Sequence, residues 1–294
     1  MKIVITGREG QVVQSLLEKS SQRPDMQVMA LGRPDMDLAQ PETVHSAITA
    51  LKPDLVVSAA AYTAVDLAED EPELAFAVNA AGAQAVAEAA AACGVPVIHI
   101  STDYVFAGDA GSPYVETDLT DPRSIYGRSK LEGERLVTQA NPKHIILRTA
   151  WVYSPFGKNF VKTMLKIAET REALSVVSDQ WGNPTNALDI ADAIIKVADQ
   201  LAAVPDFSAY GVYHLAGTGD TNWSGFARAI FNESAKLGGR AAVVTDISAA
   251  DYRTKALRPA NSRLSTAKFQ EVFNWSAPQW KSSLAYVVSR VLQS

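Results

Sequence analysis

The chain has 294 residues, 47% of them hydrophobic and 20% charged, and carries a net charge of −5. This length allows one large or two modest globular domains, and the acidic balance argues against a nucleic-acid partner, because such binders usually carry a basic excess. Cys93 is the only cysteine, which excludes an intrachain disulfide and fits a reducing compartment. Because it ends an alanine-rich helical stretch, we expect Cys93 to be a buried packing residue.

Membrane insertion, secretion and metal binding are also disfavoured. No run of about 18 apolar residues occurs, so no membrane span is expected. The chain begins with a short strand pattern instead of the long apolar stretch and cleavage site of a signal peptide, which predicts a cytoplasmic protein. The four histidines show no metal-ligand spacing, and we predict no metal site.

Short apolar runs alternate with helical patterns through the first half of the chain. Strands are predicted over Lys2–Thr6, Gln27–Leu31, Leu55–Ser58, Val97–Ser101 and His144–Thr149. Helices are predicted over Gln11–Ser20, Pro41–Leu51, Pro72–Cys93 and Ser124–Gln139. The strand runs are almost entirely Val, Ile and Leu, as in strands covered by helices on both faces. The alternation therefore predicts an α/β fold, a Rossmann-type doubly wound parallel sheet.

The pattern loosens after Trp151, where Asn-Pro, Gly and Trp signals and a basic, irregular segment appear. We expect residues 1–150 to form the sheet domain and residues 151–294 to form mainly a smaller C-terminal substrate-binding domain. Segments near residues 186–216, including a strand at Gly211–Leu215, are expected to return to the main sheet.

A glycine turn, Gly7-Arg8-Glu9-Gly10, joins the first strand to the first helix. Glycines at this place permit a tight turn and let a pyrophosphate approach backbone N–H groups at a helix N-terminus. Val13 stands where the usual fingerprint has a third glycine, so its side chain should press on the helix–strand packing. An ordinary strand-to-helix turn is the alternative, but the β-α-β context favours an NAD(P)-binding domain.

The end of the second strand, Leu31-Gly32-Arg33, lacks the carboxylate that binds the ribose 2′-hydroxyl in NAD-specific sites. Arg33, or Arg8 in the glycine turn, could bind a 2′-phosphate instead. A solvated surface arginine is the alternative for each. Asp37 and Leu38, a few residues further, are placed to border the adenine.

Tyr126 and Lys130 form a Tyr-x-x-x-Lys pair at the start of a predicted helix. Residues four apart share a helix face, and an ammonium beside a phenol lowers the phenol's pKa. The tyrosine could then donate and accept a proton near neutral pH. The spacing alone is unspecific, because it also arises by chance.

Ser101-Thr102-Asp103 ends the strand at Val97–Ser101. Ligands gather at the carboxyl ends of parallel strands, so a hydroxyl here could bond to a ketone that Tyr126 protonates. A hydroxyl that only caps a turn is the alternative.

Together these motifs, with Gly7-x-x-Gly10-Gln11 and Ser101–Phe106, resemble the extended short-chain dehydrogenase/reductases. Further stretches resemble one family among them, the dTDP-4-dehydrorhamnose reductases, and extend almost to the C-terminus. These stretches are Ala59–Asp66, Glu71–Glu73, Arg148–Tyr153, Asn159–Val161, Asp179–Thr185 and Arg258–Leu264.

The resemblance implies a role for each matching residue. Thr102, Tyr126 and Lys130 would be catalytic, with Tyr126 as general acid and Lys130 also bound to the cofactor ribose. The residues implied to bind the pyrophosphate are Gly7, Gly10, Gln11 and Val12, and those beside the nicotinamide are Ala59, Ala60 and Thr63. The residues implied to contact the substrate are Val105, Trp151, Arg258, Asn261 and Arg263.

The activity implied by the resemblance is reduction of dTDP-4-dehydro-L-rhamnose to dTDP-L-rhamnose by NADPH, with NADH as a second acceptable donor. Two alternatives stay open. One is another nucleotide-sugar reductase or an epimerase of the same superfamily, and the other is an NADP-binding regulatory subunit without turnover.

The resemblance also bears on assembly. Some members of the family are dimers bridged by a metal that first-helix carboxylates bind, but Val13-Gln14-Ser15-Leu16 contains no carboxylate and Glu18 lies one turn further. We therefore expect a monomer, or a homodimer without a metal bridge.

Overall fold

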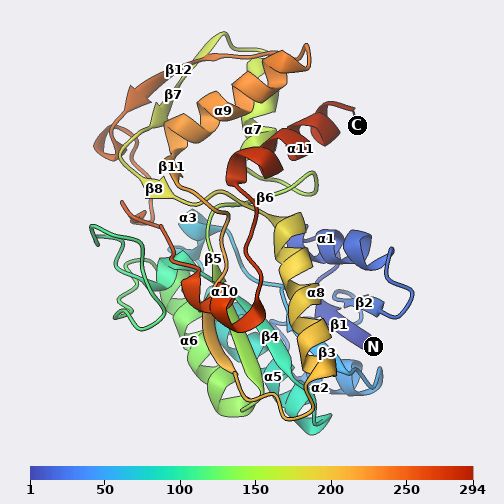
Figure 1. Ribbon diagram of the computed structural model, residues 1–294. Helices are drawn as coiled ribbons and strands as arrows, with labels where there is room; N and C mark the ends of the chain where they lie inside the picture. Colours follow the sequence, from blue (N-terminus) through green and yellow to red (C-terminus); the bar gives the residue numbers. More distant parts are fainter. Residues whose placement is uncertain (294) are drawn as a thin grey trace.

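A six-stranded parallel sheet lies at the centre of the larger half of the molecule, the lower half in Figure 1. The computed structural model describes residues 1–293. In spatial order the strands are β10 (Gly211–His214), β5 (His144–Thr149), β4 (Val97–Thr102), β3 (Leu55–Ser58), β1 (Lys2–Thr6) and β2 (Gln27–Leu31). Every neighbouring pair is parallel. The predicted doubly wound sheet is confirmed.

Side chains alternate between the two faces of the sheet, and both faces are buried. In β1, Ile3 and Ile5 pack with one set of helices and Val4 packs with the other. The first set is α1 (Gln11–Ser20), α8 (Ala187–Ala203) and α10 (Ala267–Phe273). The second set is α2 (Glu42–Thr49), α5 (Ala83–Ala92) and α6 (Ile125–Ala140). Burial on both faces explains the uniformly apolar strand sequences.

The segment predicted as one helix, Pro72–Cys93, is interrupted. It consists of α4 (Pro72–Phe76), a π-helical turn η1 (Ala77–Gly82) and α5. By length and apolar composition Pro72–Ala92 could cross a membrane, but 56% of its most apolar window is buried within the protein, as in a core helix. Cys93, expected to be buried, is only half-buried because it caps the end of α5.

Segments late in the sequence complete the main sheet. Strand β10 pairs with β5, and α8 and α10 add Ile190, Ile194 and Phe273 to the core on the α1 face. In the sequence these segments alternate with those of a second core, so the chain leaves the larger half after β5 and returns to it twice.

The second core forms the upper half of Figure 1, where three helices pack beside a two-stranded parallel sheet. The helices are α7 (Phe160–Ala168), α9 (Trp223–Lys236) and α11 (Trp280–Gln293), and the strands are β7 (Ala173–Val177) and β12 (Val243–Ile247). The remaining short elements are β6 (Val152–Tyr153), β8 (Trp181–Gly182), β9 (Thr185–Asn186), β11 (Thr221–Asn222), α3 (Val65–Ala68), η2 (Asp103–Val105) and η3 (Ala249–Asp251).

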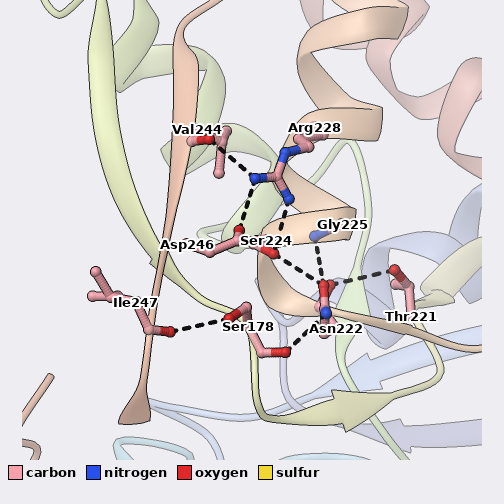
Figure 2. Close-up of polar contacts among 9 residues, drawn as sticks. All are labelled: Ser178, Thr221, Asn222, Ser224, Gly225, Arg228, Val244, Asp246 and Ile247. Atoms are coloured by element: carbon pink, nitrogen blue, oxygen red, sulfur yellow. Dashed lines mark hydrogen bonds and ion pairs between the residues drawn. The ribbon is translucent and has the colours of Figure 1, made fainter. Parts of the chain in front are cut away.

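Polar contacts fix the start of α9 against this small sheet (Figure 2). Asn222 caps the helix by accepting a hydrogen bond from Gly225 N at 2.7 Å, and its amide donates to Ser178 O at 2.8 Å. Arg228, one turn further, pairs with Asp246 of β12 at 2.7 Å. Trp223, the first residue of α9, is thereby placed at the boundary between the two halves.

An ion pair buried inside the larger half joins α6 to the sheet. Glu134 of α6 and Arg148 of β5 are each about 5% exposed, and Arg148 donates to both carboxylate oxygens, at 2.7 and 2.9 Å. Ser101 of β4 also donates to Glu134. Removing one partner of such a pair leaves a charge buried without compensation.

We expect Glu134→Ala to lower the free energy of unfolding by about 3–5 kcal/mol, because Arg148 would remain buried and unpaired. Urea denaturation followed by circular dichroism measures the change. The control is Glu132→Ala on the same helix, where the exposed pair with Arg135 should contribute little. Equal effects of the two substitutions would contradict the assignment.

Candidate active site

The strand order β2–β1–β3 creates a crevice at the carboxyl end of β1, where neighbouring connections diverge to opposite sides. Gly7 begins the turn there with φ +100°, and its N–H donates to Leu31 O at 2.8 Å. A Cβ on Gly32 would lie 3.3 Å from Gly7 Cα. The close approach of these two glycines leaves the backbone of the turn open to a ligand.

Val13 fits beneath this turn. Its side chain is buried in the core with Leu16, and its Cγ2 would lie 3.2 Å from a Cβ on Gly7. Val13 therefore fills the space under the turn. The crowding expected from its side chain affects position 7, where both the positive φ and the lack of space for a Cβ require glycine.

A cavity of about 650 Å³ opens beside the turn. It brings together five residues predicted to bind the cofactor: Gly7, Arg33, Asp37, Leu38 and Ala60. It is also lined by residues that sequence reasoning did not select, including Met36, Tyr62 and Val78. Its shape and position suit the adenosine part of a dinucleotide.

The two arginines at this cavity differ in their partners. Arg8 forms an ion pair with Asp35 and donates to Gly32 O at 3.3 Å. Arg33 is exposed, and within residues 1–293 its side chain makes no hydrogen bond or ion pair. Arg33 is therefore the guanidinium that is free to bind an anion.

The other predicted cofactor residues lie along the same edge. Ala59 and Ala60 donate their N–H groups to Thr6 Oγ1, both at 3.0 Å, and Thr63 is exposed on the following loop. Thr6 is a site residue that sequence reasoning missed, because its buried hydroxyl acts only through backbone groups.

The remaining three predicted cofactor residues lie at the start of α1. Gly10 is its N-cap, Gln11 and Val12 follow, and Gln11 Oε1 accepts hydrogen bonds from Ser154 and Asn159, at 2.8 and 3.0 Å. The Gln11 side chain therefore binds the segment after β6, while the backbone of the turn faces the crevice.

The structure brings the three predicted catalytic residues together at the ends of β4 and α6. Thr102 is the last residue of β4, and Tyr126 is the second residue of α6, which Ser124 caps. The Thr102 side chain lies close enough to the Tyr126 phenol to affect its pKa. Lys130 lies one turn further along α6 and is 3% exposed.

The expected lowering of the Tyr126 pKa is wrong for the protein alone. Burial raises this pKa above its usual value, and the hydrogen bond with Thr102 only partly opposes the effect. The Lys130 ammonium donates to Ile100 O at 2.7 Å, inside the sheet. Burial lowers the pKa of Lys130 to about 8, against the favourable charge of Glu134. Tyr126 is thus a protonated phenol at neutral pH.

A buried asparagine positions α6, the helix that carries Tyr126 and Lys130. Asn79, in the π-helical turn, accepts from Tyr62 N at 2.8 Å and donates to Ser129 Oγ at 3.0 Å. A Cβ on Gly133 would lie 2.1 Å from Asn79 O, so α6 must have a glycine there. Sequence reasoning missed Asn79. The available indication of its role was a polar amide side chain within an alanine-rich run.

Trp151 lies at the boundary between the two halves, with φ +48°. Its ring stacks on Trp223 at a centroid distance of 3.6 Å, and its other face lies against Gly182, whose Cβ would clash with it at 2.5 Å. Val105, also predicted to contact substrate, is fully buried with Phe106. Val105 therefore shapes the site from within the core, which corrects its predicted contact with substrate, whereas Trp151 is partly exposed at the boundary.

The basic loop Arg258–Arg263 lies over the site, and its polar groups already have partners. Arg258 pairs with Asp66 of α3 at 2.7 Å and lies 3.5 Å from the Tyr104 hydroxyl. Asn261 donates to the carbonyls of Ala110 and Ser112. Arg263 pairs with Asp220 and bonds to Asn261 Oδ1. Of the three, Arg258 comes closest to the predicted catalytic residues, because it contacts Tyr104, whose ring packs against that of Tyr126.

Asp103, next to Thr102, is 4% exposed and accepts a hydrogen bond from the Thr102 hydroxyl at 3.0 Å. Burial raises the pKa of Asp103 to about 6, although hydrogen bonds from Ser262 and Thr102 oppose the shift. A buried carboxyl group with a raised pKa therefore lies beside the hydroxyls predicted to be catalytic.

Comparison with known proteins places this geometry in context. Residues 1–293 match the family described as the RmlD substrate binding domain. A dTDP-4-dehydrorhamnose reductase of Sinorhizobium fredii is 50% identical over 292 residues, covering 99% of this chain and 98% of that protein. Its counterpart in Escherichia coli K12 is 41% identical, over 96% of this chain and 95% of that protein.

Solved structures of this kind of reductase have the same fold as this chain. A dTDP-4-dehydrorhamnose reductase of Clostridium acetobutylicum superposes with a TM-score of 0.92 at 36% identity, covering all of both chains. The enzyme of Bacillus anthracis, solved in complex with NADP, gives a TM-score of 0.89 at 34% identity, covering 97% of this chain and 98% of that one.

We expect Asp103→Asn to gain stability relative to the wild type as pH rises from about 4 to 6. The folded-state pKa of about 6 exceeds the ordinary 3.8, so the stability from protonated Asp103 is present at low pH and lost as pH rises. The difference should approach about 3 kcal/mol above pH 6. Urea denaturation at pH 4.5 and 7.5 measures it, with the exposed Asp206→Asn as control. A difference independent of pH would contradict the assignment.

Proposed function

The chain belongs to the family of dTDP-4-dehydrorhamnose reductases, and we propose that it reduces the C4 ketone of dTDP-4-dehydro-L-rhamnose to give dTDP-L-rhamnose, with NADPH as the hydride donor. The observation that carries this proposal is the convergence of Thr102, Tyr126 and Lys130 at the carboxyl edge of the sheet, beside the glycine turn. This reaction is the last step of dTDP-rhamnose synthesis.

Proton delivery falls to Tyr126. A ketone that accepts hydride develops negative charge on its oxygen, and a neighbouring acid must neutralise it. Burial keeps the Tyr126 phenol protonated at neutral pH, which is the state that a reductase needs. The Thr102 hydroxyl, which donates to Asp103 in the free protein, would turn its hydrogen toward the same oxygen when the ketone binds. The Lys130 ammonium stabilises the phenolate that forms.

NADPH supplies the hydride when it is bound. The residues proposed to hold it are Gly7, Gly10, Gln11, Val12, Arg33, Asp37, Leu38, Ala59, Ala60 and Thr63, together with Tyr126 and Lys130. The cavity beside the turn and the free guanidinium of Arg33 support this assignment, because a 2′-phosphate carries two negative charges. The sugar nucleotide would contact Trp151, Arg258, Asn261 and Arg263, and the fully buried Val105 would support this site from beneath.

Residues 1–150, with the later segments that rejoin the sheet, are proposed as the cofactor domain, and the rest of 151–294 as the substrate domain. We also propose a cytoplasmic enzyme that is a monomer or a homodimer without a metal bridge. Glu18, the carboxylate on α1, binds both Nη atoms of Arg290, at 2.6 and 2.8 Å. Within residues 1–293 no cluster of three or more metal-ligating side chains occurs.

The direct test is incubation of the purified protein with NADPH and the dTDP-keto sugar, with the product identified by NMR. Stoichiometric NADPH oxidation and formation of dTDP-L-rhamnose are expected. Conversion without net NADPH consumption would indicate an epimerase, and cofactor binding without turnover would indicate a regulatory protein. Either result would overturn the proposal.

We expect Tyr126→Phe to reduce kcat by about 10²–10⁴, the usual effect of losing a positioned general acid. NADPH affinity should be retained, because the ring and Lys130 remain. Lys130→Met should lose both turnover and cofactor affinity, since the lysine serves two partners. Steady-state kinetics at saturating substrates and fluorescence titration with NADPH measure the two effects, and near-normal kcat in Tyr126→Phe would refute the mechanism.

We expect Arg33→Ala to weaken NADPH binding by about 1–3 kcal/mol and to leave NADH binding nearly unchanged, because only NADPH has the 2′-phosphate. Titration with both cofactors measures the ratio. Arg8→Ala is the comparison, and its guanidinium already pairs with Asp35. Equal weakening of both cofactors in Arg33→Ala would transfer the role to Arg8.

A further inference from the structure

A histidine lies in the middle of the apolar strand β4, beneath the catalytic helix. His99 is 1% exposed, and a buried imidazole is costly unless it is hydrogen-bonded. Both ring nitrogens have partners: Nδ1 lies 3.0 Å from Ser58 Oγ, and Nε2 lies 3.4 Å from Lys130 Nζ. The ring therefore connects the end of β3 to the catalytic lysine.

The chemistry of the partners decides which nitrogen carries the proton. A lysine ammonium can only donate, so Nε2 of His99 must accept. Nδ1 then carries the hydrogen and donates it to Ser58 Oγ. Burial, and next the charge of Lys130, lower the pKa of His99 well below its usual value, so the ring stays neutral.

We propose that His99 is a positioning residue whose Nε2 lone pair keeps the Lys130 ammonium charged and in place one turn below Tyr126, with Ser58 fixing the tautomer. The inference rests on the proposed reductase function. Of the three Lys130 N–H groups, one donates to Ile100 O and one to His99, which leaves one for the active site.

The other ionisable groups around Lys130 do not replace this acceptor. On α6 these are Tyr126, which stays neutral, and Glu134, whose charge favours the ammonium. On β5, Arg148 binds both oxygens of Glu134 and so offsets much of that charge. On β4, His99 is the group that accepts a hydrogen bond from Lys130 through its side chain.

The experiment compares pH profiles of kcat/KM between pH 6 and 10. In His99→Phe the ammonium loses an acceptor, so its pKa falls, and activity that needs charged Lys130 is lost at lower pH. We expect the alkaline limb to move down by about one pH unit. His99→Gln, whose Oε1 can accept from Lys130, should restore most of the profile.

The matched control is His214→Phe, which removes another fully buried histidine that bonds to Tyr114 O and lies away from Lys130. Its alkaline limb should match that of the wild type. An unmoved limb in His99→Phe, or an equal shift in His214→Phe, would overturn the proposal.

A measurement on the wild-type protein does not depend on folding of the variants. Nitrogen-15 NMR of histidine-labelled protein, assigned by the signal lost in His99→Gln, should show a neutral ring protonated at Nδ1. Protonation at Nε2 would overturn the inference whatever the activity. Absence of turnover in the wild type would instead count against the proposed function and leave the tautomer test intact.

Discussion

Helix α6 is bound to the central sheet by two ionic side chains one turn apart, Lys130 and Glu134. Their partners, His99 and Ser101, alternate along β4, so a strand that is apolar on one face is polar toward the helix. Buried polar groups have few acceptable geometries, because each polar atom left without a hydrogen bond destabilises the fold. This contact therefore determines where Tyr126 lies relative to the end of β4.

The sequence was sufficient for the sheet and for the convergence of Thr102, Tyr126 and Lys130 at its edge. Runs of Val, Ile and Leu predicted β1, β3 and β5 to the residue, because burial on both faces leaves little choice of side chain. The bounds of the partly exposed edge strand β2 were also predicted to the residue. The glycine turn and the Tyr126–Lys130 spacing were equally local signals. Features that depend on a single helix, strand or turn can be predicted from the local residue pattern.

Features that depend on two distant segments were not predictable in this way. The π-helical turn at Ala77–Gly82 exists because Asn79 bonds to Tyr62 and packs on Gly133, and neither contact has a periodic signature. The raised pKa of Tyr126 results from burial by the assembled fold. The ion pair between Arg258 and Asp66 joins residues far apart in the chain, so nothing in the sequence indicated that Arg258 already has a partner.

The return of β10 and α10 to the main sheet has a consequence for biosynthesis. On the ribosome, the first 150 residues emerge with β5 as an open sheet edge and with the α1 face only partly covered. That edge is paired only after residue 214 is made, and the face is completed by Phe269 and Phe273, near the end of the chain. The two halves therefore cannot mature in succession, and the nascent chain exposes the β5 edge until residue 214 has been made.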